Sequence, residues 1–110
     1  MDSGSPEERL AALRCGHMRP FEGARFRSRA EDGTTQDWVL REVRDEGRAD
    51  GRHGPASLRR PFSLYFEPSD GRPSAQGRYV LESERFPALE IFLTPVLIEP
   101  GRVWMQAVFH

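Results

Sequence analysis

The 110-residue sequence contains no lysine and a single cysteine. All sixteen basic residues are arginine, a bias that we attribute to codon pressure in a GC-rich genome. Because Cys15 has no second cysteine to pair with, an internal disulfide is impossible, which excludes the disulfide framework of a small secreted domain. A reducing compartment is therefore expected.

The sequence also lacks a long apolar run. Its most apolar stretch, ALEIFLTPVLI, is too short to span a membrane and contains Glu90 and Pro95. The N-terminal MDSGSPEERL is acidic and polar, whereas a signal peptide begins with basic residues and continues with apolar ones. We therefore expect a soluble cytoplasmic protein, and assembly into an exported particle would need no signal peptide.

The sequence also lacks an excess of positive or negative charge. Seventeen acidic residues balance the sixteen arginines, and the imbalance stays small when the chain is divided into segments. A nucleic-acid-binding protein usually carries a basic patch or stripe, so no nucleic-acid partner is expected. Residues 6–15 contain only two leucines and no excess of basic residues, so a membrane-binding amphipathic helix is not expected either.

What the sequence does contain favours a β protein. Ten glycines and nine prolines suit a fold that is rich in turns, because a helical bundle would avoid so many helix breakers. A chain of this length forms one domain, residues 1–110, and buries roughly two-thirds of the surface that it exposes when unfolded. No metal or disulfide is needed to stabilise it.

One short helix is predicted near the N-terminus, with its lead-in over residues 5–16. Residues 5–8, with the sequence SPEE, combine an N-cap serine, a proline at the first helical position and a glutamate that closes a capping box. Leu10 and Leu13 follow on one face, and Gly16 is expected to end the helix. Such a helix would lie against a sheet or close the end of a barrel.

After Pro20 the pattern changes from helical to alternating. Two strands, residues 24–30 and 36–44, are predicted to be joined by a hairpin turn at residues 31–34, in which Asp32 and Gly33 supply positive φ. The two faces of the second strand are expected to carry Trp38, Leu40 and Glu42 on one side and Val39, Arg41 and Val43 on the other.

The remainder of the chain predicts one long loop, residues 45–58, and four more strands, residues 61–67, 76–83, 88–94 and 102–109. Phe62, Leu64 and Phe66 alternate with Ser63 and Tyr65, as in a strand that is buried on one face. The fold class is therefore mainly β. Residues 24–109 predict an antiparallel meander of about six strands, closed as a small barrel or folded as a sandwich.

No group of residues predicts a catalytic, cofactor-binding or metal site. Cys15 and His17 lie two residues apart, but the other histidines do not complete the spacing of a zinc site. Glu82 and Glu84 could mimic a catalytic carboxylate pair, although acids on a strand more often keep an edge solvated. The glycines of residues 71–77 do not precede a helix and therefore form no phosphate-binding loop. We expect no cofactor and no enzymatic activity.

Three features are candidates for an interaction with a protein. Trp104 either packs in the core, which is favoured, or anchors a partner at the surface. Arg59 and Arg60 could bind an acidic partner or could keep a strand entry solvated. The final strand, which carries Gln106 and His110, could pair with a partner's strand by β-addition.

Small-ligand binding is the second hypothesis. Trp104, Tyr79 and Arg102 together offer aromatic faces and a cation, which suit a carbohydrate or an anion when they line one pocket.

Four motifs in the second half carry a family resemblance: FSLYF from residue 62, QGRYVL from residue 76, LEIFLTP from residue 89 and QAVFH from residue 106. In order and spacing they resemble F-S-L-x-F, Q-G-x-Y-x-L, L-x-x-F-L-x-P and E-A-V-F-N of an uncharacterised bacterial domain family. The GARF sequence from residue 23 also resembles the family's opening G-x-x-F. Gln106 and His110 replace the family's closing Glu and Asn, so a salt bridge or terminal cap at those positions would be altered here.

The resemblance implies a setting and assigns no activity. Genes of this family are often found beside phage-tail-collar-like proteins. We therefore expect a non-enzymatic structural or adaptor module of a phage-tail-like assembly, which binds itself or a collar- or fibre-type protein. The alternative is a small β-barrel that binds a carbohydrate or another small ligand.

Overall fold

The computed structural model describes residues 15–45, 61–72 and 74–109. The predicted helix start at residues 5–8 lies outside these ranges, as does the predicted loop beyond Asp45. The described elements are α2 (Cys15–Met18), η1 (Arg19–Phe21), β1 (Arg25–Ala30), β2 (Thr35–Asp45), β3 (Phe62–Pro68), β4 (Gly77–Ser83), β5 (Phe86–Glu99) and β6 (Arg102–Phe109). The prediction of a mainly β chain with six antiparallel strands is confirmed.

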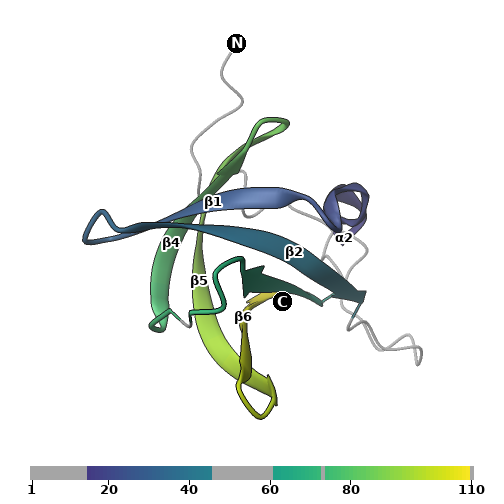
Figure 1. Ribbon diagram of the computed structural model, residues 1–110. Coiled ribbons are helices and arrows are strands. Elements are labelled where there is room, and N and C mark those ends of the chain that lie inside the picture. Colours follow the sequence, from purple (N-terminus) through teal and green to yellow (C-terminus); the bar gives the residue numbers. More distant parts are fainter. Residues whose placement is uncertain (1–14, 46–60, 73, 110) are drawn as a thin grey trace.

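The strands close into a barrel in the order β1-β2-β3-β6-β5-β4 (Figure 1). Every neighbouring pair is antiparallel. The order is not that of a simple meander, because β3 pairs with β6 and β4 pairs with β1. The sheet instead consists of two three-stranded units, β1-β2-β3 and β4-β5-β6, which meet along these two pairings.

The first hairpin agrees with its sequence pattern. β1 and β2 pair on either side of a turn in which Gly33 has a φ of 89°, and no non-glycine residue in the described ranges has positive φ. Asp32 therefore contributes through its side chain, which accepts a hydrogen bond from the Thr34 backbone N–H at 2.9 Å. A glycine is needed at this position because other L-residues are strained there.

The predicted faces of β2 are wrong beyond Leu40. The register with β3 shifts between Leu40 and Glu42, and this β-bulge moves Val43 into the core with Trp38 and Leu40. Glu42 consequently faces outward, opposite Tyr65 on β3. A bulge inserts one unpaired residue, so every side chain after it changes face.

β3 is more buried than its alternation predicted. Phe62, Leu64 and Phe66 point into the core as expected, but Ser63 and Tyr65 on the opposite face are also buried. Outside the barrel, the Tyr65 ring is covered by the Arg44 guanidinium, 4.9 Å from the ring centroid, and it lies beside Trp104. The alternation of apolar and polar residues cannot predict this burial, because the side chains that cover Tyr65 come from neighbouring strands.

β5 is the longest strand and extends beyond its predicted end at residue 94. Its first part pairs with β4, and from Thr94 onward it pairs with β6. Pro95 does not end the strand; it lies directly after this exchange of partners and opposite Met105. Proline has no backbone N–H to donate to a neighbouring strand, so it is tolerated where the regular hydrogen-bond pattern is interrupted. Here Pro95 lies where β5 changes its pairing partner, and the strand continues.

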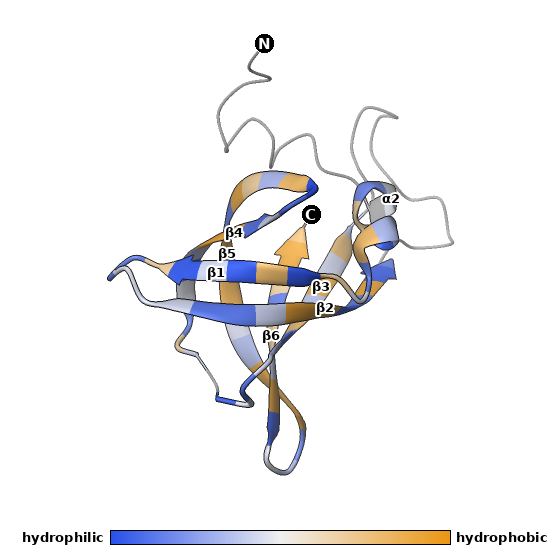
Figure 2. Cartoon of the chain, turned by 45° about the horizontal axis from the view of Figure 1, so that its top comes forward, coloured by the Kyte–Doolittle hydropathy of each residue, from blue (hydrophilic) through white to orange (hydrophobic). Residues whose placement is uncertain are grey.

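The core is filled mainly by aromatic and aliphatic side chains that point inward from all six strands, such as Trp38, Phe26 and Phe66. Figure 2 shows the matching alternation of apolar and polar residues along the strands. Met18 of α2 joins this core, so the described helical segment covers one end of the barrel. Gly16 lies within α2 and does not end it, because the helical path continues through Met18 into η1.

A polar network lies at the β2 and β3 side of the barrel, where the chain leaves β3. The buried Trp38 indole donates from Nε1 to Gln36 Oε1 at 2.9 Å. Gln36 Nε2 donates in turn to Asp70 Oδ1 at 2.8 Å and to the Arg72 carbonyl at 2.9 Å. Gln36 therefore provides the hydrogen-bond acceptor for the indole of the buried Trp38 and holds the segment between β3 and β4.

Candidate interaction surface

The exposed large hydrophobic residues of the described ranges all belong to β5 and β6. They are Phe92, Leu97, Ile98 and Val108, with exposed fractions of 53%, 70%, 40% and 48%. Single exposed hydrophobics are common on soluble proteins, but a concentration on two neighbouring strands marks a surface that is suited to binding.

Leu97 and Ile98 lie near the tip of the β5–β6 hairpin, which projects from the barrel at the bottom of Figure 1. We call residues 96–104 the β5–β6 arm. Gly101, with a φ of 80°, allows the tight turn at its tip, and the register shifts between Leu97 and Glu99. Val96 pairs with Trp104 and Leu97 with Val103, so apolar side chains occupy both faces of the arm.

Trp104 lies on the outer face of β6 at the base of the arm. It is half-buried, with the Tyr65 ring 6.2 Å away between centroids and the Arg102 guanidinium 5.4 Å from its own ring centroid. Its Nε1 is buried and has no hydrogen-bond acceptor among the described residues. The prediction that favoured the core for Trp104 is therefore wrong in part, because the side chain packs against neighbours outside the barrel.

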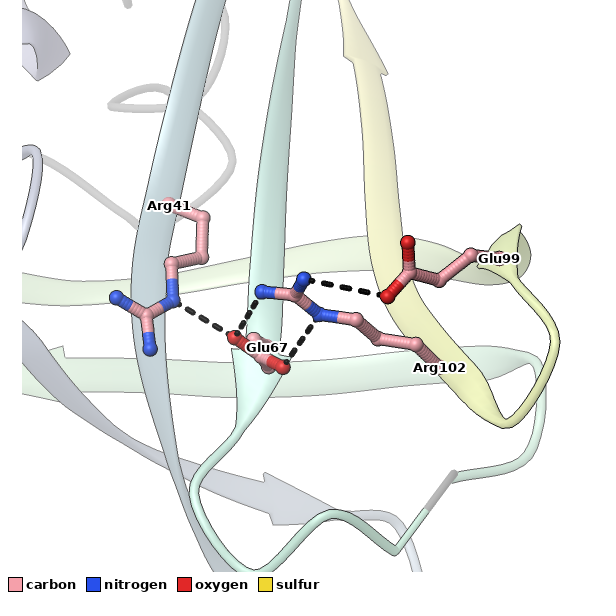
Figure 3. Close-up of polar contacts among 4 residues, drawn as sticks. All are labelled: Arg41, Glu67, Glu99 and Arg102. Atoms are coloured by element: carbon pink, nitrogen blue, oxygen red, sulfur yellow. Dashed lines mark hydrogen bonds and ion pairs between the residues drawn. The ribbon is translucent and has the colours of Figure 1, made fainter.

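A charged cluster adjoins this tryptophan (Figure 3). Glu67 of β3 accepts from Arg41 Nε at 2.7 Å on one side and from Arg102 Nε at 3.2 Å on the other. Arg102 Nη1 also lies 3.7 Å from Glu99 Oε2 of the arm. The cluster links β2, β3 and β6 and holds the Arg102 guanidinium close to the face of the Trp104 ring.

The electrostatics of the cluster follow from these contacts. The hydrogen bond from Arg102, together with the bond from Arg41 and the positive charge of both groups, holds the pKa of Glu67 below its ordinary value, against the opposing effect of partial burial. The same carboxylate raises the pKa of Arg102. Glu67 therefore stays ionised at a lower pH than an isolated glutamate, and its charge keeps Arg102 in place.

The residues singled out from the sequence are only partly brought together. Arg102, Trp104 and Gln106 share the outer face of β6, where Gln106 Nε2 donates to the Tyr65 hydroxyl at 2.9 Å. Tyr79 instead points into the barrel, where it is 7% exposed and its hydroxyl donates to the Ala75 carbonyl. Tyr79 therefore lines no common pocket with Trp104 and Arg102. Arg59, Arg60 and His110 lie outside the described residues.

The final strand is not available for β-addition along the length that its pairings cover. β6 pairs with β3 on one side and with β5 on the other, within a closed barrel. The sequence could not show this, because an alternating pattern gives the two faces of a strand but not its neighbours. Any contact made by β6 must therefore depend mainly on side chains.

A groove lies at the other end of β5. It has a volume of about 770 Å³ and is lined by residues of η1, β1, β2, the end of β4 and the turn between β4 and β5, including Phe21, Ala24, Arg25, Glu82, Glu84 and Arg85. The Arg85 guanidinium lies 6.0 Å from the centroid of the Phe21 ring. The suspected carboxylate pair, Glu82 and Glu84, is thus part of the wall of an open groove.

The described ranges contain no group of three or more His, Cys, Asp or Glu residues that could hold a metal ion. None of their helices has the length and apolar character to cross a membrane.

The model of a domain of unknown function, DUF6916, matches residues 13–109. The chain belongs to the DUF6916 family. Neither the curated proteins nor the solved structures gave a match to it.

The DUF6916 match includes the barrel strands, so the barrel is the structure of the family domain in this chain. Many of the apolar positions in the sequence motifs, such as Phe62, Leu81 and Leu93, are buried in its core. Sequence reasoning missed Leu97 and Ile98 of this DUF6916 chain, although one signal was present. Two adjacent apolar residues before a turn cannot both face the same core in a strand.

Proposed function

We propose that this DUF6916 chain is a non-enzymatic structural or adaptor module of a phage-tail-like assembly. It docks on a collar- or fibre-type protein, or on itself, through the β5–β6 arm and the adjoining face of β6. The observation that carries the proposal is the gathering of exposed apolar side chains on these two strands. The tail-like setting is what the family resemblance implies, because genes of that family are often found beside phage-tail-collar-like proteins.

The arm has the composition of a binding surface. Fully burying a leucine or isoleucine side chain contributes roughly 1.5–3 kcal/mol, so Leu97 and Ile98 together would supply much of the energy of a moderate complex. Tryptophan and arginine are the residue types most often found at the energetic centres of interfaces, and Trp104 and Arg102 lie in contact at the base of the arm. The tryptophan and the arginine therefore lie on the same hairpin as the exposed apolar side chains.

Trp104 adds a polar element to this surface. Its buried Nε1 donor has no acceptor among residues 15–45, 61–72 and 74–109, and an unsatisfied buried donor costs roughly 1–3 kcal/mol. A modest rotation of the ring at an interface would allow this group to donate to a carbonyl or carboxylate of a partner. Docking would then relieve a cost that is already present in the unbound barrel.

The test is light scattering on the purified protein, alone and mixed with the product of a neighbouring tail-collar-like gene. We expect a defined complex for the native chain and a loss of affinity of about tenfold or more for Leu97→Ser. Arg29→Ser is the matched control, because Arg29 is exposed on β1 and far along the chain from the arm. The proposal would be refuted if the protein is a monomer that does not bind the neighbouring gene product, or if both variants lose the same affinity.

A further inference from the structure

One edge of β5 has no neighbouring strand over the second half of its length. β4 pairs with β5 only as far as Leu93, and β6 pairs with the opposite side of β5 from Thr94 to Glu99. In the described part of the chain, no strand pairs with the β4 side of residues 94–99, which we call the outer edge of β5. Figures 1 and 2 both show the β5–β6 hairpin projecting beyond the other strands. The projecting part is therefore a ribbon of two strands with one side open.

Pro95 indicates which backbone groups face this outer edge. Alternate residues of an antiparallel strand direct their N–H and C=O groups to the same side. Proline has no N–H to donate, and on an edge strand its nitrogen faces away from the paired neighbour. Pro95 lies opposite Met105 of β6 and therefore faces the outer edge, as does Leu97 two residues further on. The outer edge thus offers the Leu97 N–H and the carbonyls of Pro95 and Leu97, whereas the Val96 N–H faces β6.

The side chains along the outer edge suit an added strand. Residues 94–98, with the sequence TPVLI, include no charged residue, and Leu97 and Ile98 are 70% and 40% exposed. Proteins often protect an open edge with charged side chains. The opposite edge of the same hairpin has such protection, because Arg102 of β6 lies 3.2 Å from the Glu67 carboxylate. The outer edge of β5 has no charge of this kind before Glu99.

The two-stranded ribbon also lacks the support that a third strand gives. A hairpin of two strands is only marginally stable in water, and three strands with an apolar face are needed for independent stability. Val96 and Leu97 place apolar side chains on both faces of the arm. An extended chain on the outer edge would pair with its open backbone groups, because it presents donors and acceptors at the same repeat, and it would cover the side chains beside them.

We infer that a partner protein contributes an extended segment with alternating apolar side chains, which pairs with the outer edge of β5 as an added strand. The inference rests on the proposed function and names how the partner is bound. A second copy of this chain is the poorer occupant. Two reciprocal outer edges would share only residues 95–99 of each copy, whereas a specific interface buries roughly 1,200 Å² or more in total.

A proline substitution tests the backbone contact. Leu97→Pro removes the N–H at the outer edge but keeps an apolar side chain, and the native Pro95 shows that this side of the strand accepts proline. We expect Leu97→Pro to bind the product of a neighbouring tail-collar-like gene about tenfold more weakly than the native chain does. Leu97→Ile is the matched control, because it keeps both the N–H and the apolar volume, and its affinity should stay within about threefold.

Amide hydrogen exchange on the native chain provides a second measurement, which decides the question even if Leu97→Pro does not fold. The Leu97 amide should exchange quickly in the free protein and at least about tenfold more slowly in the complex. The Val96 amide is the internal control, because Val96 pairs with Trp104 in both states. A Leu97 amide that is already protected in the free protein, or that exchanges equally fast in the complex, would overturn the inference.

The same experiments separate this inference from the proposed function. If Leu97→Ser loses affinity while Leu97→Pro binds like Leu97→Ile, docking through side chains stands and strand addition is refuted. If the native chain does not bind the neighbouring gene product, both are refuted. If the protein alone forms a dimer that Leu97→Pro abolishes, the added strand comes from a second copy, and its assignment to another protein is overturned.

Discussion

Replacing Gln36 with leucine should destabilise the barrel far more than its position in an exposed network suggests. Gln36 Oε1 is the acceptor for the indole N–H of Trp38, a residue with no exposed surface. Leucine has a similar volume but no acceptor, so the Trp38 donor would remain buried and unsatisfied. The variant would also lose the bonds from Nε2 to Asp70 and to the Arg72 carbonyl.

The magnitude follows from these losses. An unsatisfied buried donor costs roughly 1–3 kcal/mol, and each of the two solvent-exposed bonds contributes about 0.5–1 kcal/mol net, so we expect a loss of about 2–5 kcal/mol. For a chain of 110 residues the entropy of unfolding is roughly 0.23 kcal/mol per kelvin, which converts this loss into a decrease of about 10–20 °C in Tm.

Thermal and urea unfolding followed by tryptophan fluorescence would measure the change. Gln76→Leu is the control, because Gln76 is exposed and shares the β3–β4 connection; its effect should stay within about 0.5 kcal/mol. The pKa of Asp70, held low by the Arg72 backbone N–H and then by Gln36, should rise in Gln36→Leu when it is followed by NMR. Equal stability of Gln36→Leu and Gln76→Leu would refute the reasoning.

Three further predictions follow from the cluster and the arm. Because the folded pKa of Glu67 lies below its ordinary value of 4.5, its stabilising effect is present above that value and is lost as the pH falls through the folded pKa; Glu67→Gln should lower Tm at pH 7 but not in strong acid. Trp104→Phe should leave stability unchanged or raise it by about 1 kcal/mol in urea unfolding, since it removes a buried donor with no acceptor in the described part of the chain; a loss of more than about 1 kcal/mol would contradict this expectation. Gly101→Ala, at a φ of 80°, should cost about 1 kcal/mol in the same assay, and Gly77→Ala, with ordinary φ, should cost less.

The strands could be predicted from the sequence because alternation and turn residues are local signals. β1, β4 and β6 begin and end within one residue of their predicted bounds. The bulge after Leu40 and the extension of β5 through Pro95 were missed, since each depends on which strand lies alongside. Period-2 alternation shows which side chains share a face and contains no information on neighbouring strands.

The candidate surface was predicted less completely. Arg102 and Trp104 were singled out by residue type and Gln106 by its departure from the family motif, and the structure places the three together on β6. Glu67, which holds Arg102, gave no signal, because an ion pair between distant strands is visible only after the barrel closes. Leu97 and Ile98 were absent from the prediction because apolar residues in a strand are usually assigned to the core.

The division of the barrel into two three-stranded units has a consequence for how the chain folds. In β4-β5-β6 the strands follow one another through short turns, so their contacts close small loops and should form early. The two seams join distant parts of the chain: Tyr65 and Gln106 are 41 residues apart. Loop closure of this kind slows folding, so we expect the transition state to contain the β4-β5-β6 unit with the seams still open. Substitutions in the seams should then accelerate unfolding and leave the folding rate almost unchanged, and a large effect on the folding rate would argue for early closure of the barrel.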